Sequence, residues 1–169
     1  MVTARSICNH LYFFRGNDVS TVLDYGAGNL RNTIYLSRHG FKVTAVDVPE
    51  QITALKSNAA ERGSWRLMDT EELTWTDKQF DLIISNFVIT LLSAEERREM
   101  LFQIREKLRP QGYLLVEVHS NEHRLSGSTR PKSKTYSTPE MDNLIMPLGF
   151  RRIHKSLGRS AVALLYQKW

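Results

Sequence analysis

The sequence predicts an α/β fold with a doubly wound, mostly parallel sheet, helices on both of its faces and a C-terminal antiparallel hairpin. Short apolar runs rich in β-branched residues alternate with helical patterns along most of the chain, which is typical of parallel strands connected by helices. The last two apolar runs are separated only by "GRS", and two strands joined by so short a turn must pair antiparallel. A glycine-rich turn after the first strand marks the sheet edge at which open α/β folds bind ligands.

The composition and length suit one globular domain. The chain has 169 residues, of which 41% are hydrophobic and 24% charged, and this balance allows a sizeable core. We expect residues 1–20 to form a short N-terminal helical cap and residues 21–169 to form a single Rossmann-like domain. The net charge of +5 suits solubility or attraction to an anionic partner.

The sequence also indicates a cytoplasmic protein. Cys8 is the single cysteine, so no internal disulfide can form, and the first residues lack the apolar run of a signal peptide. No stretch approaches the roughly 20 apolar residues that a membrane span needs, and no membrane partner is expected.

The N-terminal half contains three predicted strands and two predicted helices after the cap. The strands are marked by β-branched and apolar residues and cover residues 21–26, 41–48 and 65–69. The helices show apolar residues at helical spacing, cover residues 30–40 and 50–63, and each ends at a glycine.

The C-terminal half continues the alternation and then ends in the hairpin. A strand begins at residue 80 and runs into apolar residues up to 92, and the helix over 93–112 starts with the capping-box pair Ser93 and Glu96. The remaining elements are a strand over 113–119, a polar loop over 120–137, a helix with its cap at Thr138, and hairpin strands over 150–157 and 161–169.

A glycine turn and two strand-end acids indicate the type of ligand. The turn around Gly26 and Gly28 lets a ligand approach the backbone closely, and Asp47 at the end of the next strand can accept hydrogen bonds from both hydroxyls of a ribose. These residues suggest a nicotinamide dinucleotide or S-adenosylmethionine. The dinucleotide fingerprint requires glycine where Arg31 stands. The carboxylate of Asp24 would repel a pyrophosphate but attract an ammonium or sulfonium group, which favours S-adenosylmethionine.

Three segments resemble the motifs of one enzyme family. The segment "VLDYGAGNLRNTIYLSRHGFKVTAVDV" resembles the first two motifs of class I, Rossmann-like S-adenosylmethionine-dependent methyltransferases. The segments "FDLIISNFVITLL" and "LRPQGYLLVEVH" are similar to the fourth-strand motif and the helix-to-fifth-strand segment of that family. The resemblance covers residues 22–169 in the right order, and it implies S-adenosylmethionine as the cofactor.

The resemblance further implies a set of cofactor contacts at the strand ends. Asp24 would lie near the methionine part, Asp47 would hold the ribose, Val48 would pack on adenine and Asp69 would accept from the adenine amino group. The alternatives are a capping role for Asp47 and Asp69 and plain core packing for Phe87. The whole set is Asp24, Gly26, Ala27, Gly28, Asp47, Val48, Asp69, Thr70, Asn86 and Phe87.

The acceptor side carries fewer signals. Methyl transfer needs a nucleophile held about 3–3.5 Å from the methyl carbon, and an oxygen or nitrogen nucleophile must also lose a proton to a base. His119 at the end of the fifth strand is the candidate catalytic base, and Glu117 lies on the same face of that strand. The candidate substrate contacts are Tyr12 and Phe13, whose alternative is helix packing on the sheet, and Arg124 and Tyr136 in the polar loop.

Several features narrow the chemistry. Leu30 stands where the family often has a third glycine, and we expect it to narrow the space near the cofactor's carboxylate. The turn "NFVI" lacks the prolines of enzymes that methylate amino groups of nucleic acids, and Cys8 lies far from the turn at which cytosine C5 methylation needs its nucleophile. No Cys/His cluster has metal-ligand spacing, so no metal is expected.

The sequence therefore predicts S-adenosylmethionine-dependent methyl transfer to O or N of a small molecule. Basic residues in the polar loop favour an anionic acceptor, although a solvated loop is the plainer interpretation. Two alternatives stay open: a catalytically weak methyltransferase-like subunit that needs a partner chain, and an RNA methyltransferase steered by the basic loop. RNA is the less favoured acceptor because Tyr136 is the loop's only tyrosine, tryptophan or phenylalanine.

Overall fold

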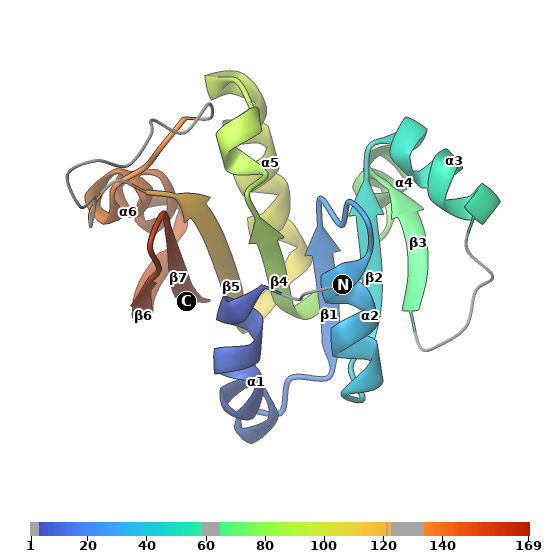
Figure 1. The fold of residues 1–169 in the computed structure, drawn as a ribbon, viewed down its shortest axis with the longest axis horizontal. Helices are drawn as coiled ribbons and strands as arrows, with labels where there is room; N and C mark the ends of the chain where they lie inside the picture. Colours follow the sequence, from blue (N-terminus) through green and yellow to red (C-terminus); the bar gives the residue numbers. More distant parts are fainter. Residues whose placement is uncertain (1–3, 59–64, 121, 123–133) are drawn as a thin grey trace.

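A seven-stranded sheet forms the centre of the computed structural model, which describes residues 4–58, 65–120, 122 and 134–169 (Figure 1). The strand order is β3-β2-β1-β4-β5-β7-β6, and every neighbouring pair from β3 to β5 is parallel. β7 pairs antiparallel with both β5 and β6, which confirms the predicted fold class. The strands are β1 Thr21–Tyr25, β2 Lys42–Asp47, β3 Trp65–Asp69, β4 Phe80–Asn86, β5 Leu108–His119, β6 Phe150–Leu157 and β7 Ala161–Lys168.

Helices cover both faces of the sheet. Buried residues of α1 and α2 join the cluster that contains Val22 and Leu82, and α3 packs on the same face through Ala45. Buried residues of α4, α5 and α6 join the cluster that contains Leu23 and Ile83 on the opposite face. The helices are α1 Arg5–Gly16, α2 Arg31–Arg38, α3 Pro49–Asn58, α4 Thr70–Trp75, α5 Ala94–Lys107 and α6 Thr138–Ile145, with short 3₁₀ turns at Ile89–Leu91 and Met146–Leu148.

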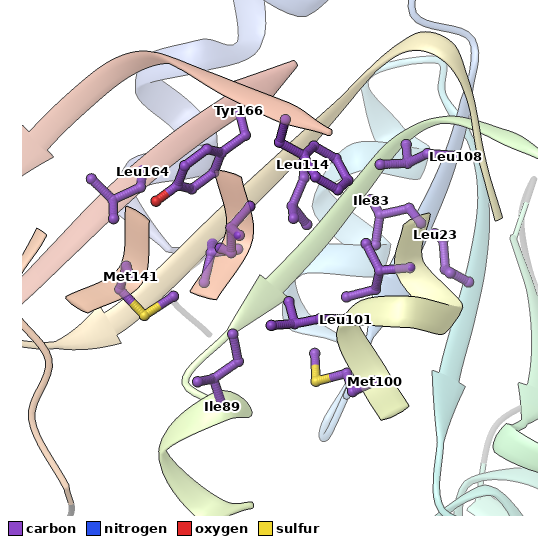
Figure 2. Close-up of a cluster of buried hydrophobic side chains, with 14 of the residues drawn as sticks. Leu23, Ile83, Ile89, Met100, Leu101, Leu108, Leu114, Met141, Leu164 and Tyr166 are labelled. Carbon is purple, nitrogen blue, oxygen red and sulfur yellow. The ribbon is translucent and has the colours of Figure 1, made fainter. Parts of the chain in front are cut away.

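The larger core lies between the sheet and helices α5 and α6 (Figure 2). Side chains from β1, β4, β5 and β7 meet side chains of the two helices there, and all of them are almost completely buried. This packing holds the strands whose carboxyl ends carry the candidate site residues. The labelled members of the cluster are Leu23, Ile83, Ile89, Met100, Leu101, Leu108, Leu114, Met141, Leu164 and Tyr166.

Two local predictions differ from the structure, and one short helix was missed. Helix α5 begins at the predicted capping box of Ser93 and Glu96, but it ends at Lys107 because Leu108 is buried and already pairs with Phe80 in the sheet. The cap of α6 is not Thr138 but the residue before it, whose side chain forms a capping box with Glu140. The short helix α4 was not predicted at all. Its capping box, which begins at Asp69, was the overlooked signal.

No helix among the described parts of the chain combines the length and the apolar character that crossing a membrane requires.

Candidate functional site

The glycine turn after β1 is held by the end of β2. The N–H groups of Gly26 and Ala27 both donate to the Val46 carbonyl, at 2.7 and 3.0 Å. Gly26 has a φ of +75°, and a Cβ on it would lie 2.2 Å from a methyl group of Val88, so only glycine fits there. Gly28 also has a positive φ, but a Cβ there would meet no atom within 4 Å, which leaves open space beside its backbone.

Asp47 fastens the turn to β2 through both carboxylate oxygens. Its Oδ2 accepts from the Gly28 N–H at 2.8 Å, and its Oδ1 accepts from the Val48 N–H at 2.9 Å. The side chain is only half-buried. Since each carboxylate oxygen can accept more than one hydrogen bond, both still have capacity for donors on the open side.

Asp24 lies in the interior rather than in a cavity wall. The residue is 2% exposed, and the Thr33 hydroxyl of α2 donates to its Oδ2 at 2.6 Å. Burial raises the pKa of Asp24 to about 6, against the lowering effect of hydrogen bonds from Thr33 and with a smaller raising effect of Asp47. Whether it also faces the methionine part of a cofactor stays a prediction.

Two adjoining cavities lie at this edge of the sheet and share Gly26, Asp47 and Val48. The first, of about 480 Å³, extends between α4 and α5 and has several apolar wall residues. The second, of about 530 Å³, extends over the glycine turn and has more polar walls. The first is further lined by Tyr25, Thr70, Val88, Leu92 and Met100, and the second by Ala27, Gly28, Arg31, Gln51, Asn86 and Phe87.

Of the two residues predicted to lie around adenine, one lines the first cavity and the other caps a helix. Thr70 lines the first cavity, whereas Asp69 is not among its lining residues. The Asp69 carboxylate instead accepts from the Glu72 N–H at 2.8 Å, and the Glu72 carboxylate accepts from the Asp69 N–H at 3.0 Å. Asp69 therefore has the capping role that was its alternative: its side chain caps the start of α4.

The ends of β4 and β5 bring four candidate residues together. The Asn86 amide Nδ2 donates to Glu117 Oε2 at 2.6 Å, and the Phe87 N–H donates to the Glu117 carbonyl at 2.7 Å. Phe87 has a φ of +63°, and its ring lies against the His119 ring with a centroid distance of 4.5 Å. Ser6 of α1 also donates to Glu117 Oε2, at 2.7 Å.

The proposed acceptor contacts outside this cluster do not join the cavities. Tyr12 is 83% exposed, and Phe13 packs edge-on against Tyr113 near the opposite, amino end of the sheet. These two expectations are therefore corrected: the α1 register turns Phe13 toward the sheet and Tyr12 toward solvent. Arg124 and two further basic residues of the polar loop, Arg130 and Lys132, lie outside the described residues.

Tyr136 is buried in the core rather than exposed on a loop. Its N–H donates to the His119 carbonyl at 2.8 Å, which ties it to the end of β5. The residue is 3% exposed and belongs to the core cluster under α5 and α6, with the Arg97 guanidinium 5.7 Å from its ring centroid. It lines neither of the two cavities.

The expected narrowing by Leu30 is also corrected. Leu30 adopts a φ of +64° as a glycine would, but its side chain is 4% exposed and packs with Ala45, Ile52 and Leu67. The side chain therefore fills the core beneath α3 and does not line either cavity.

Val88 and Ser6 are site residues that the sequence reasoning missed. Val88 stands two residues after Asn86 in the same motif, so its proximity to the glycine turn had a local signal. Ser6 had none, because its contact with Glu117 spans 111 positions of the chain. Among the described residues, no group of three or more His, Cys, Asp or Glu side chains is placed to hold a metal ion.

The comparisons with known sequences agree on one type of domain. A family model described as "Methyltransferase domain" matches residues 22–112 of the chain. The protein named "Putative methyltransferase YqeM" of Bacillus subtilis (strain 168) is 29% identical to the chain over 108 residues. That match takes in 59% of this chain and 42% of YqeM, so the chain spans less than half of the relative's length.

Solved structures of methyltransferases share the fold. The glycopeptide N-methyltransferase MtfA, complexed with S-adenosylmethionine, matches with a TM-score of 0.75 at 18% identity over 96% of this chain and 93% of its own. The 1,6-didemethyltoxoflavin-N1-methyltransferase of Burkholderia thailandensis, with bound 1,6-didemethyltoxoflavin and S-adenosylhomocysteine, matches with a TM-score of 0.70 at 22% identity over 96% of this chain and 76% of its own.

Proposed function

The chain belongs to the class I, Rossmann-like family of S-adenosylmethionine-dependent methyltransferases, and we propose that its acceptor is a small molecule methylated on oxygen or nitrogen. S-adenosylmethionine is the cofactor of this family. The observation that carries the proposal is the pair of adjoining cavities at the carboxyl edge of the sheet, which share Gly26, Asp47 and Val48.

The residues at this edge fit the cofactor. The Asn86 side-chain oxygen is buried and has no hydrogen-bond partner among the described residues, and Asn86 lines the polar cavity. An unpartnered buried acceptor is costly, and an ammonium group in that cavity would supply its missing donor. The open space beside Gly28 and the remaining acceptor capacity of Asp47 suit a ligand that carries both hydroxyl and ammonium donors.

We assign the two ends of the cofactor to the two cavities. Val48, Val88 and Thr70 would hold the adenine in the less polar cavity, and Asp47, which lines both, would hold the ribose hydroxyls. The glycine turn and Asn86 would hold the methionine end. When bound, the cofactor supplies a methyl group already activated on a sulfonium, so the protein mainly has to position the acceptor and exclude water.

His119 is the proposed base for the acceptor's proton. Its ring is half-buried and lies against Phe87, which is next to Asn86 at the edge of the polar cavity. A base at this place would be near an acceptor held beside the methionine end of the cofactor. His119→Asn should lower kcat by about 10²- to 10⁴-fold if His119 removes that proton, with little change in cofactor affinity.

Calorimetry tests the cofactor assignment directly. S-adenosylmethionine and S-adenosylhomocysteine should bind the purified chain, and nicotinamide dinucleotide should not. The reverse preference would overturn the assignment of the cavities. Turnover on small acceptors would support the small-molecule proposal. Cofactor binding without turnover would point to a subunit that needs a partner, and salt-sensitive RNA binding would point to an RNA acceptor.

The N-methyltransferases among the structural neighbours support nitrogen as one acceptor atom. MtfA is named for a glycopeptide acceptor and the Burkholderia enzyme for 1,6-didemethyltoxoflavin, and both enzymes are named as N-methyltransferases. Neither acceptor is assigned to this chain.

A further inference from the structure

A third cavity lies between α1, the end of β5 and the β6–β7 hairpin. It has a volume of about 180 Å³ and is lined by both charged and polar side chains. At about 30 Å³ for each water molecule in liquid water, this volume corresponds to roughly six waters, so it suits a small group. Its lining residues include Arg5, Ser6, Asn9, Glu117 and Ala161.

Glu117 joins this small cavity to the proposed cofactor site. Its Oε2 accepts from Asn86 Nδ2 at 2.6 Å, and Asn86 lines the 530 Å³ cavity. The same Oε2 accepts from the Ser6 hydroxyl at 2.7 Å, and both Ser6 and Glu117 line the 180 Å³ cavity. The hydrogen bond between Asn86 and Glu117 therefore connects a lining residue of one cavity with a lining residue of the other.

The charge of Glu117 is unmatched. No cation of the described chain lies within ion-pair distance of it, and both of its side-chain hydrogen bonds converge on one oxygen. Its Oε1 accepts no hydrogen bond from the described residues. A half-buried carboxylate in this condition favours a cationic or strongly donating ligand on its free side.

Arg5 provides an opposite charge in the wall of the same cavity. Its side chain is exposed and forms no ion pair with another described residue. A ligand that carries an amine and a carboxylate would match both free charges, with the amine toward Glu117 and the carboxylate toward Arg5.

We propose that the 180 Å³ cavity is the acceptor pocket and that it takes a small amine bearing a carboxylate, whose nitrogen faces Glu117. This inference rests on the proposed methyltransferase function and names its substrate class. In the reaction, the bound ammonium first gives one proton to His119 or to water, which frees the nitrogen lone pair. The lone pair then forms the new N–C bond, and the S–C bond breaks with its electron pair remaining on sulfur. The positive charge thus moves from sulfur to nitrogen, where the Glu117 carboxylate stabilises it.

Glu117→Gln is the informative variant. The glutamine oxygen can still accept from Asn86 and Ser6, so the local structure is kept while the charge is lost. Ala161→Leu provides a second test, because Ala161 lines the cavity from β7, pairs with His119 and is not one of the residues assigned to the cofactor. Glu106→Gln on the surface of α5 is the matched control for loss of one negative charge.

The experiment titrates glycine, β-alanine, ethanolamine and glycolate into the protein saturated with S-adenosylhomocysteine. Methyl transfer from labelled S-adenosylmethionine to the same probes is followed in parallel. We expect the two amino acids to bind and to be N-methylated more efficiently than ethanolamine, and glycolate to be inert. Glu117→Gln and Ala161→Leu should each lower kcat/KM for the amino acids by at least about tenfold. Glu106→Gln should match the wild type, and S-adenosylhomocysteine affinity should stay within about twofold in all variants.

The possible outcomes separate a failure of the proposed acceptor pocket from a failure of the proposed methyltransferase function. Equal use of the amino acids by wild type and Glu117→Gln would overturn the role of Glu117, and preference for glycolate would overturn the amine class. If the wild type binds S-adenosylhomocysteine but none of the amines, the acceptor pocket is wrong while the proposed function stands. If the wild type binds no S-adenosylhomocysteine, the proposed function itself fails.

Discussion

The buried carboxyl group of Asp24 makes the stability of the folded chain depend on pH. Its pKa rises from an ordinary value of 3.8 to about 6, mainly because burial disfavours the charged form. The folded state therefore binds the proton more tightly than the unfolded state does. This contribution to stability is complete below pH 3.8, falls as the pH rises toward 6 and is absent above it.

Asp24→Asn should accordingly stabilise the cofactor-free protein at neutral pH. A shift of about 2 units corresponds to roughly 3 kcal/mol, and the asparagine oxygen can still accept from the Thr33 hydroxyl. Urea unfolding should show a gain of about 1–3 kcal/mol at neutral pH and little difference near pH 4. Equal stability at neutral pH would mean that Asp24 is not ionised there or that water relieves its burial. If Asp24 also attracts the cofactor's ammonium, the same variant should bind S-adenosylhomocysteine more weakly.

Asp47 combines a structural role with a proposed cofactor contact. Asp47→Ala removes the acceptors of the Gly28 and Val48 N–H groups, so we expect a loss of about 1–3 kcal/mol in the free energy of unfolding. If the carboxylate also holds the ribose hydroxyls, S-adenosylhomocysteine affinity should fall by at least about tenfold. Calorimetry and urea unfolding measure the two effects separately, with Asp77→Ala as an exposed control. Normal affinity in the folded fraction would make Asp47 purely structural.

At the scale of elements, the segments with strong local signals were predicted well and those shaped by tertiary contacts were not. The capping box of α5 and the hairpin turn between β6 and β7 depend on neighbouring residues, so the sequence showed both. The start of β5 depends on the pairing of Leu108 with Phe80, far away in the chain, and the helix pattern concealed it. The same applies to Phe13, whose direction is set by packing on Tyr113.

Leu30 at the start of α2 tests how the glycine turn tolerates a departure from the family pattern. Leu30→Gly removes the cost of about 1–2 kcal/mol that leucine incurs in a left-handed backbone conformation. The same substitution deletes a buried side chain whose loss should destabilise the fold by about 2–5 kcal/mol. We expect a net destabilisation of about 1–3 kcal/mol and little change in S-adenosylhomocysteine affinity.

Leu30→Ala is the matched control, because it loses the side chain and keeps the strained backbone. It should therefore be less stable than Leu30→Gly by about 1–2 kcal/mol. Tighter cofactor binding by Leu30→Gly without a loss of stability would restore the idea that the leucine narrows the cavity.

At the scale of the whole molecule, the mostly parallel sheet and the glycine turn at its carboxyl edge followed from the alternation of elements. The strand order and the enclosure of the proposed acceptor side did not. The proposed acceptor side includes α1, which reaches Glu117 through Ser6 and the final hairpin through His10. These contacts join residues more than 100 positions apart, and no local pattern encodes them. The strand-end acids could be found from spacing alone, whereas the pairing of Glu117 with Asn86 required the sheet register.

Two histidines form a hydrogen bond between α1 and the hairpin. His10 Nδ1 donates to the Ser6 carbonyl at 2.7 Å, so its Nε2 is the acceptor of the 2.8 Å hydrogen bond from His154 Nδ1 when the ring is neutral. Burial lowers the pKa of His10 from 6.5, the Ser6 carbonyl acts against this, and the charge on His154 adds to the lowering. The stability contributed by His10 is therefore present above pH 6.5 and is lost as the pH falls below it.

At neutral pH, the free energy of unfolding of His10→Gln should be about 1–2 kcal/mol lower than that of the wild type, because the variant lacks the hydrogen bonds of the histidine ring. On acidification to about pH 5, the free energy of unfolding should fall less in His10→Gln than in the wild type. Urea unfolding at both pH values measures the difference. Parallel profiles for the two proteins would show that His10 binds its proton equally well in the folded and unfolded chains.

Asp24 and His10 should oppose each other in the same acidic interval. As the pH falls from neutrality, protonation of Asp24 favours the folded state while protonation of His10 disfavours it. Asp24→Asn should therefore be more stable than the wild type at neutral pH and yet lose stability more steeply between about pH 6.5 and pH 4. The double variant with His10→Gln should show a flatter profile than Asp24→Asn, because both opposing groups are then gone. In the described part of the chain the two side chains share no hydrogen bond or ion pair, and they lie on different elements, so the effects should add within about 0.5 kcal/mol. A steeper profile for the double variant would mean that another group controls the acid response of the domain.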